Sequence, residues 1–279
     1  MLSVKKMSIE DFEFAVRLTD TKGWSFVEED FQFMVELEPE GCFVSFDNSE
    51  RIGIITSVGF GKIGWFGSLI VEEKHRKKGA GALLVRHVIN YLKGKNVETV
   101  GLYAYTDTIS FYEHLGFKYD SDFLVLEGTA FASPVKTDVR LARREDFQRI
   151  IDYDSSCFGA SRKKLLEAIQ CKVNNLCYVS AENGQMLGYI VAKVYEGVSE
   201  IGPLVCERGR TDIAVDLLKT VLNKLDGFEV SFCIPEKESA ILNFLVKSGI
   251  SERFRVARMF FKPPKIKDCV YIAESLERG

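Results

Sequence analysis

The amino-acid sequence is internally repeated, and the repeat restricts the fold to two copies of one domain. Residues 4–12 align with residues 139–147, so the second copy begins 135 positions after the first (139 against 4). Three apolar segments keep this offset: 42–45 on 177–180, 52–55 on 187–190 and 67–70 on 202–205. A constant register over several strand-like segments is typical of a duplicated domain.

Length and charge agree with two globular domains. The chain has 279 residues, enough for two cores of ordinary size. Its formal net charge of −3 argues against a general nucleic-acid or membrane-surface binder. No apolar signal region begins the sequence, and no stretch approaches the roughly eighteen apolar residues of a membrane span. We therefore expect a cytoplasmic protein that binds neither nucleic acid nor membrane.

Both copies have the pattern of a mixed α/β domain. Each opens with a helical pattern, at 9–18 and at 145–153. Strand patterns follow, joined by polar turns at 47–49 and 182–184, and then strand, helix, strand, helix and strand. The expected fold class is therefore α/β with two tandem domains.

A basic, glycine-containing segment follows the apolar run at 63–71 and precedes a helical pattern at 83–92. It reads Arg76, Lys77, Lys78, Gly79, Ala80, Gly81 and Ala82. A strand that leads through such a turn into a helix N-terminus presents free backbone N–H groups and positive charge to an anion, typically a phosphate. A dinucleotide fingerprint fits poorly, because Leu84 stands where a third small residue belongs, and a P-loop lysine motif is absent.

This segment resembles the pyrophosphate loop of the GNAT (Gcn5-related) N-acetyltransferases, with the spacing Arg-x-x-Gly-x-Gly-Ala over residues 76–82. Residues 111–117, Phe-Tyr-Glu-His-Leu-Gly-Phe, resemble the second signature of the same superfamily at the usual distance. The resemblance implies acetyl-CoA as co-substrate. It also implies two mixed, mostly antiparallel sheets flanked by helices, each with a fourth and a fifth strand that diverge. Gly64 and Gly67 in the fourth strand fit that picture, although tight packing explains them equally well.

The second copy keeps the fold pattern and loses the chemistry. Residues 206–214 contain no Gly-x-Gly, and Asp212 would put negative charge near a pyrophosphate. At an offset of 133, Leu245 replaces Tyr112 (245 against 112). This copy resembles the degenerate second domain of some tandem acetyltransferases. We expect a catalytic domain over 1–128, a linker over 129–137 and a degenerate domain over 138–279.

The resemblance also assigns site residues. The backbone N–H groups of residues 77–82 would hold the pyrophosphate, with charge from Arg76, Lys77 or Lys78. The strand end contributes Leu69, Ile70 and Val71, and an N–H near Leu69 or Ile70 would polarise the thioester carbonyl. Tyr112 is the candidate proton donor to the leaving thiolate. It could also act by hydrogen-bonding the thiolate, because reference pKa values of about 10 and 8.5 make full transfer uphill.

The sequence says less about the amine acceptor and the residues that bind and deprotonate it. A primary amine of a small molecule or peptide is protonated at neutral pH, so a base is required. From Arg51 to Val71 no acidic residue occurs, which leaves Glu28, Glu29 and Asp30, the second lobe, or water. Trp24 is either a wall of the acceptor pocket or a core residue. Arg162 either clamps a carboxylate or phosphate of the acceptor, or is an exposed arginine at a helix start.

The cysteines argue against metal and thiol chemistry. Seven of them, without any Cys-x-x-Cys, indicate buried free thiols in a reducing compartment, and we expect no metal site.

A non-catalytic sensor of acyl-CoA, or an interaction protein, is the alternative to an enzyme. Tyr112 beside an intact loop favours the enzyme, and the unassigned base favours the alternative.

Overall fold

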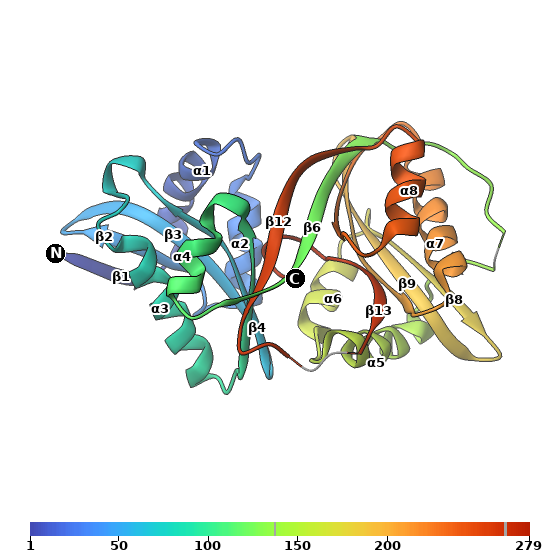
Figure 1. The fold of residues 1–279 in the computed structure, drawn as a ribbon, viewed down its shortest axis with the longest axis horizontal. Coiled ribbons are helices and arrows are strands. Elements are labelled where there is room, and N and C mark those ends of the chain that lie inside the picture. Colours follow the sequence, from blue (N-terminus) through green and yellow to red (C-terminus); the bar gives the residue numbers. More distant parts are fainter. Residues whose placement is uncertain (137, 265–266) are drawn as a thin grey trace.

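Two lobes share one continuous thirteen-stranded sheet in the computed structural model, which describes residues 1–136, 138–264 and 267–279. The strand order is β1-β2-β3-β4-β5-β12-β6-β11-β10-β9-β8-β7, with β13 paired to β10. Figure 1 shows the lobes side by side, with β6 and β12 between them. The α/β class and the flanking helices expected from the sequence are confirmed.

The first half of the chain supplies six strands and four helices among the described residues. The strands are β1 (Leu2–Lys6), β2 (Phe43–Asp47), β3 (Glu50–Phe60), β4 (Ile63–Val71), β5 (Thr99–Tyr105) and β6 (Lys118–Thr129). The helices are α1 (Phe12–Asp20), α2 (Glu28–Leu37), α3 (Ala80–Gly94) and α4 (Ile109–His114).

The second half of the chain repeats this order and adds one strand. Its strands are β7 (Arg140–Leu141), β8 (Leu176–Glu182), β9 (Gln185–Val194), β10 (Val198–Glu207), β11 (Glu229–Pro235), β12 (Ser251–Phe261) and β13 (Cys269–Ile272). Its helices are α5 (Phe147–Phe158), α6 (Lys163–Gln170), α7 (Thr211–Lys224) and α8 (Ser239–Lys247). The extra strand β13 has no counterpart in the first half.

Helices cover both faces of the first-lobe sheet, because neighbouring strand residues point to opposite sides. Phe43 and Ile55 pack with α3, whereas Val44 and Ile54 pack with α1 and α2. Helix α3 buries one stripe of residues: Ala80, Leu84, Val85, Val88, Ile89 and Leu92. This spacing is the helical periodicity read from the sequence.

The last strands of the two halves are exchanged. Strand β12 pairs with β5 and so completes the first lobe, whereas β6 pairs with β11 and completes the second. The two strands also pair with each other, antiparallel, with Lys118 opposite Phe260 and Glu127 opposite Ser251. Each lobe therefore depends on a strand from the other half of the chain, and the predicted division at 128–138 does not separate the lobes in space. Thr137, the predicted end of the linker, lies outside the described residues.

A buried carboxylate ties the lobes together. Glu38 follows α2 and accepts hydrogen bonds from Tyr91 Oη (2.5 Å), Lys95 Nζ (2.8 Å) and, across the interface, Lys164 Nζ of α6 (2.5 Å). Burial alone would raise the pKa of Glu38, but these donors and the Gly59 N–H lower it to about 2. The Glu38 carboxylate is therefore ionised, and its hydrogen bonds link the first lobe to α6 of the second.

No helix of the described residues is long and apolar enough to cross a membrane.

Candidate active site

Strands β4 and β5 diverge as the resemblance implies. They pair in parallel only where Ile63, Gly64 and Trp65 face Thr99, Val100 and Gly101. Beyond these residues β4 continues to Val71 and β5 to Tyr105 without pairing to each other. The backbones of the two strands therefore separate beyond Trp65, next to the N-terminus of α3, and we call this gap in the pairing the slot.

A β-bulge lies at the start of this slot. The register between β3 and β4 shifts between Gly67 and Ile70, and Ser68 has a left-handed backbone with φ of 49°. The Ser68 hydroxyl is buried and has no hydrogen-bond partner among the described residues. A buried donor without a partner is costly, so the Ser68 hydroxyl is available to a polar group that enters here. The sequence analysis did not single out Ser68. The repeat contained a signal for it, because Pro203 occupies the same position in the second copy.

The two strand glycines have different neighbours. A Cβ added at Gly64 would lie 2.9 Å from Leu92 Cδ1 of α3, so Gly64 permits helix packing. A Cβ added at Gly67 would lie 2.6 Å from Glu277 Cα, so Gly67 permits an approach of the chain's own last segment.

The basic segment forms a turn before α3 whose backbone geometry suits an anion. Lys77 and Gly79 have positive φ values of 61° and 90°, and α3 begins at Ala80. The first helical acceptor is Gly79 O, bonded by Leu83 N at 2.9 Å, so the N–H groups of residues 80–82 belong to the unpaired first turn. Arg76 Nε donates to Val71 O (2.9 Å). The side chains of Lys77 and Lys78 are exposed beside the turn.

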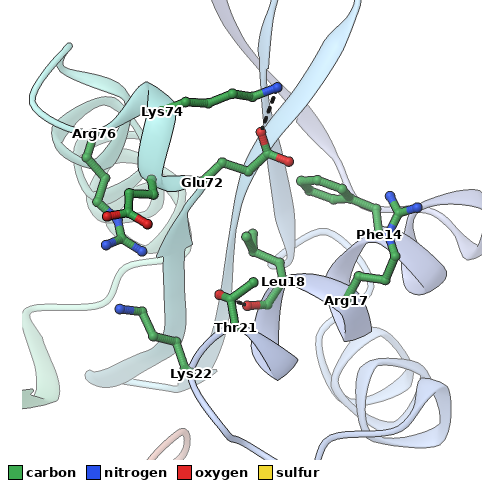
Figure 2. Close-up of a pocket in the computed structure, with 9 residues that line it drawn as sticks. Phe14, Arg17, Leu18, Thr21, Lys22, Glu72, Lys74 and Arg76 are labelled. Atoms are coloured by element: carbon green, nitrogen blue, oxygen red, sulfur yellow. Dashed lines mark hydrogen bonds and ion pairs between the residues drawn. The ribbon is translucent and has the colours of Figure 1, made fainter.

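A pocket of about 530 Å³ opens beside this turn, between the end of α1 and the segment after β4 (Figure 2). It is lined by Phe14, Arg17, Leu18, Thr21, Lys22, Glu72, Glu73, Lys74 and Arg76. Basic side chains outnumber acidic ones in this lining. The pocket therefore extends the positive surface of the turn toward α1.

Tyr112 lies against the slot. Its ring contacts Phe66 of β4 and Phe117, with centroids 6.1 and 6.0 Å apart. Burial raises the pKa of the Tyr112 hydroxyl. The phenol is therefore neutral at physiological pH, and it can donate a hydrogen bond to a charged leaving group. The raised pKa also makes complete proton transfer harder, which favours hydrogen bonding over full donation.

Trp24 lies at the open end of β5. Its Nε1 donates to Tyr105 Oη (3.0 Å), and the two rings stack with centroids 6.4 Å apart. The residue is half-buried and packs on the cluster formed by α1 and α2. Trp24 is thus next to the slot, and its part in an acceptor pocket stays a prediction.

Arg162 is in the interior, which contradicts both predictions made for it. Its side chain is 0% exposed. The guanidinium donates to both carboxylate oxygens of Asp154 (3.1 and 2.6 Å), to Tyr271 Oη (3.2 Å) and to Gly279 O (2.7 Å). Arg162 is therefore a structural anchor for residues near the end of the described chain, with its donors already engaged.

The corresponding slot of the second lobe is filled. Strands β10 and β11 pair only over Val198–Glu200 and Glu229–Ser231. Beyond that point β13 pairs with β10, with Leu204 opposite Ile272 and Glu207 opposite Cys269. Ala273 N then donates to Cys233 O of β11 (2.9 Å). The chain itself thus occupies the space that the first lobe leaves open.

The cysteine prediction is wrong for two residues. Cys157 of α5 and Cys269 of β13 form a disulfide, although 112 positions separate them in the sequence. The other five are free thiols. The spacing could not predict this pairing, because β13 lies next to α5 only once it fills the second slot.

One group of described residues could hold a metal ion: Glu50, Glu72 and His75, with ligand atoms within 4.8 Å of one another. The Lys74 ammonium pairs with both carboxylates. The Lys74 ammonium therefore already provides a positive charge beside Glu50 and Glu72.

Comparisons with known proteins agree with this geometry. Residues 6–117 match the sequence model of the acetyltransferase (GNAT) family, and residues 150–271 match a second model described as an acetyltransferase (GNAT) domain. An uncharacterized N-acetyltransferase of Bacillus subtilis is 21% identical over 264 residues, which covers 92% of this chain and 90% of that protein.

Solved structures are similar over nearly the whole chain. A crystal structure of a putative acetyltransferase from Pyrococcus horikoshii has a TM-score of 0.80 and 21% identity, and the match covers 100% of this chain and 96% of that one. A GCN5-related N-acetyltransferase from Sphaerobacter thermophilus has a TM-score of 0.72 and 16% identity, with 95% and 98% covered. A tandem GNAT protein from the clavulanic acid biosynthesis pathway has a TM-score of 0.65 and 12% identity, with 95% and 100% covered.

Proposed function

Because this chain is an acyltransferase built of two GNAT domains in tandem, we propose that its first lobe transfers the acetyl group of acetyl-CoA to a primary amine of a small molecule or peptide. Proteins of the GNAT family use acetyl-CoA as a co-substrate. The observation that carries the proposal is the open β4–β5 slot beside an anion-binding turn, in contrast to the filled slot of the second lobe.

The turn and the slot have the features that acetyl-CoA requires. The unpaired N–H groups of residues 80–82 and the exposed Lys77 and Lys78 suit a pyrophosphate. Each hydrogen bond to a charged group contributes about 1.5–3 kcal/mol, against about 0.3–1 kcal/mol for the helix dipole. Several amides acting together therefore provide most of the affinity. The unpartnered Ser68 hydroxyl is available to a polar group inside the slot.

Two groups of the chain act on the thioester, one on its carbonyl oxygen and one on its sulfur. The bulge leaves Ser68 and Leu69 without a register partner on β3, whereas Ile70 stays opposite Ile54, so the backbone N–H near Leu69 is the one that can donate to the carbonyl oxygen. Bound acetyl-CoA supplies the activated acyl group as a thioester. The neutral Tyr112 hydroxyl stabilises the thiolate as the C–S bond breaks. In the second lobe Pro203, which has neither an N–H nor a hydroxyl, stands at the position of Ser68, and Leu245 stands at the position of Tyr112.

The test is acetyl transfer itself. The full chain is incubated with acetyl-CoA and a panel of amines, amino acids and peptides, and products are read by mass spectrometry. We expect an acetylated amine with release of free thiol at the same rate. Tight binding of acetyl-CoA without any acetylated product across the panel would contradict an enzyme and favour a sensor.

A further inference from the structure

The last described segment of the chain crosses from the second lobe to the first. It begins beside β11, where Ala273 is hydrogen-bonded, and it reaches β4, where Glu277 lies on Gly67. A Cβ added at Gly67 would be 2.6 Å from Glu277 Cα and 3.1 Å from its Cγ. Figure 1 places the end of the chain, marked C, between the lobes. A carboxylate from the second half thus lies at the strand that had no acidic residue of its own.

Glu277 and Tyr112 approach β4 from opposite faces. Phe66, which contacts Tyr112, packs with α3, and Gly64 points the same way. Gly67 points to the other face, together with Trp65, because the parity of strand residues alternates. A carbonyl in the slot would therefore have the thiolate-stabilising phenol on one side and the carboxylate of Glu277 on the other.

Glu277 differs from its neighbour Glu274 in its charge environment. Glu274 is buried, but Lys193 (2.6 Å) and Arg278 (2.8 Å) bind its carboxylate and lower its pKa to about 2. Among the described residues, Glu277 has no basic partner within 4.0 Å. Burial raises the pKa of Glu277; Arg278 and Lys193 oppose this effect, and Glu200 adds to it. A carboxylate of raised pKa is a stronger base near neutral pH.

We infer that Glu277, supplied by the second half of the chain, is the general base that deprotonates the amine acceptor in the first lobe. This inference rests on the proposed function. It explains why β4 carries glycine at position 67, since any side chain there would collide with the segment that carries the base. It also gives the second lobe a part in catalysis without a cofactor site.

The proton balance of the step is complete. The ammonium acceptor gives one proton to the Glu277 carboxylate and becomes a neutral amine. The nitrogen forms a bond to the thioester carbonyl carbon, and the C–S bond breaks as the thiolate leaves. The nitrogen loses its second proton, which reaches the sulfur with Tyr112 as the hydrogen-bonding group. Glu277 then releases its proton to solvent.

The other acidic candidates are placed less well. Glu28 and Glu29 are exposed on the first turn of α2, and the carboxylate of Asp30 is bonded to Val27 N (2.9 Å). The carboxylate of Glu200 pairs with Lys193 at 2.5 Å.

The test compares two kinds of nucleophile in the Glu277→Gln variant. Tyramine, spermidine and lysine methyl ester are protonated at neutral pH, whereas hydroxylamine is already neutral and needs no base. For the alkylamines that the natural chain acetylates, we expect kcat/KM to fall at least about a hundredfold. Transfer to hydroxylamine and the Kd of acetyl-CoA should be retained.

Glu200→Gln is the matched control. Removing this neighbouring negative charge should lower the pKa of Glu277, so the rise of kcat/KM with pH should move to lower pH without a large loss of activity. The charged and titratable groups around Glu277 that enter this profile are Arg278, Glu200, Lys193, Tyr105 and Cys233.

The outcomes separate the two proposals. Equal activity of Glu277→Gln and the natural chain toward an alkylamine would overturn the base and leave the acetyltransferase intact. If Glu277→Gln loses hydroxylamine transfer or acetyl-CoA binding as well as alkylamine transfer, Glu277 has a structural role. That result would also overturn its assignment as the general base. If the natural chain acetylates none of the amines while binding acetyl-CoA, the proposed function fails, and the base with it.

Discussion

The two lobes have the same strand order but differ at the gap between their diverging central strands. A strand of the chain fills this gap in the second lobe and not in the first. In the first lobe β4 and β5 diverge and leave a slot beside the basic turn before α3. In the second lobe β10 and β11 diverge in the same way, and β13 fills the gap. In the second copy the chain itself occupies the gap that the proposed function assigns to acetyl-CoA in the first. The filling strand is also what carries the last segment across to the first lobe.

The strand exchange makes the lobes mutually dependent, and the largest effect we predict comes from separating them. A first half expressed alone as residues 1–128 lacks β12, and its β6 has no β11 to pair with. We expect it to be unfolded or aggregated because two sheet edges are exposed. Circular dichroism and size-exclusion chromatography measure this directly.

A matched control keeps all strands and breaks only the connection. A protease site inserted near residue 132, followed by cleavage, should leave both fragments associated and able to bind acetyl-CoA. A well-folded 1–128 fragment that acetylates the same amine with unchanged KM would show that the lobes are independent after all.

The second prediction separates the roles of Trp24 and Arg162. Asp154→Ala leaves the Arg162 guanidinium buried without its carboxylate, so the free energy of unfolding should fall by about 3–5 kcal/mol. Urea unfolding measures this change. Acetyl-CoA affinity should be unchanged. Trp24→Ala, by contrast, should raise the KM of the amine with a smaller loss of stability. A stable Asp154→Ala protein with a raised amine KM would restore Arg162 as a substrate residue.

The third prediction concerns the Glu38 contact between the lobes. Its pKa is lowered from the usual 4.5 to about 2 in the folded chain. The stability that this carboxylate contributes is therefore present above pH 4.5 and lost as the pH falls toward 2, by about 2–4 kcal/mol. Acid unfolding followed by fluorescence should show one transition for both lobes. In Glu38→Gln the acid dependence should flatten, and an unchanged acid profile would exclude this contact as its source.

The fourth and smallest prediction is at Tyr112, whose counterpart Leu245 cannot donate a hydrogen bond. Tyr112→Phe should lower kcat at least about tenfold and leave the Kd of acetyl-CoA nearly unchanged, because only the hydroxyl is lost. Tyr119→Phe, at an exposed tyrosine, is the control. Unchanged turnover in Tyr112→Phe, under conditions where chemistry limits the rate, would remove Tyr112 from the mechanism.

The repeat and the loop made much of this architecture readable in the sequence. The helical periodicity of α3 and the residues of the basic turn are local patterns, so the helix start near Ala80 could be predicted. The fold class followed from the order of such patterns. The slot between β4 and β5 followed from the family resemblance carried by residues 76–82 and 111–117.

Long-range pairing was out of reach of such patterns. Strands β6 and β12 occupy equivalent places in the two copies, so nothing local indicates which sheet each one completes. Arg162 looked like an exposed helix-start residue because its partners Asp154, Tyr271 and Gly279 converge only in three dimensions. Glu277 is 210 positions from Gly67 (277 against 67), and only the path of the last segment brings them together.

Calorimetric titration of the full chain with acetyl-CoA counts its binding sites, and the proposed function places a site in the first lobe and none in the second. We expect one site per chain. Gly81→Glu should abolish it, since the new side chain puts bulk and negative charge at the first turn of α3, and Asp212→Ala in the second lobe should leave it unchanged. Two equivalent sites per chain, or a single site that survives Gly81→Glu, would contradict acetyl-CoA binding by the first lobe alone.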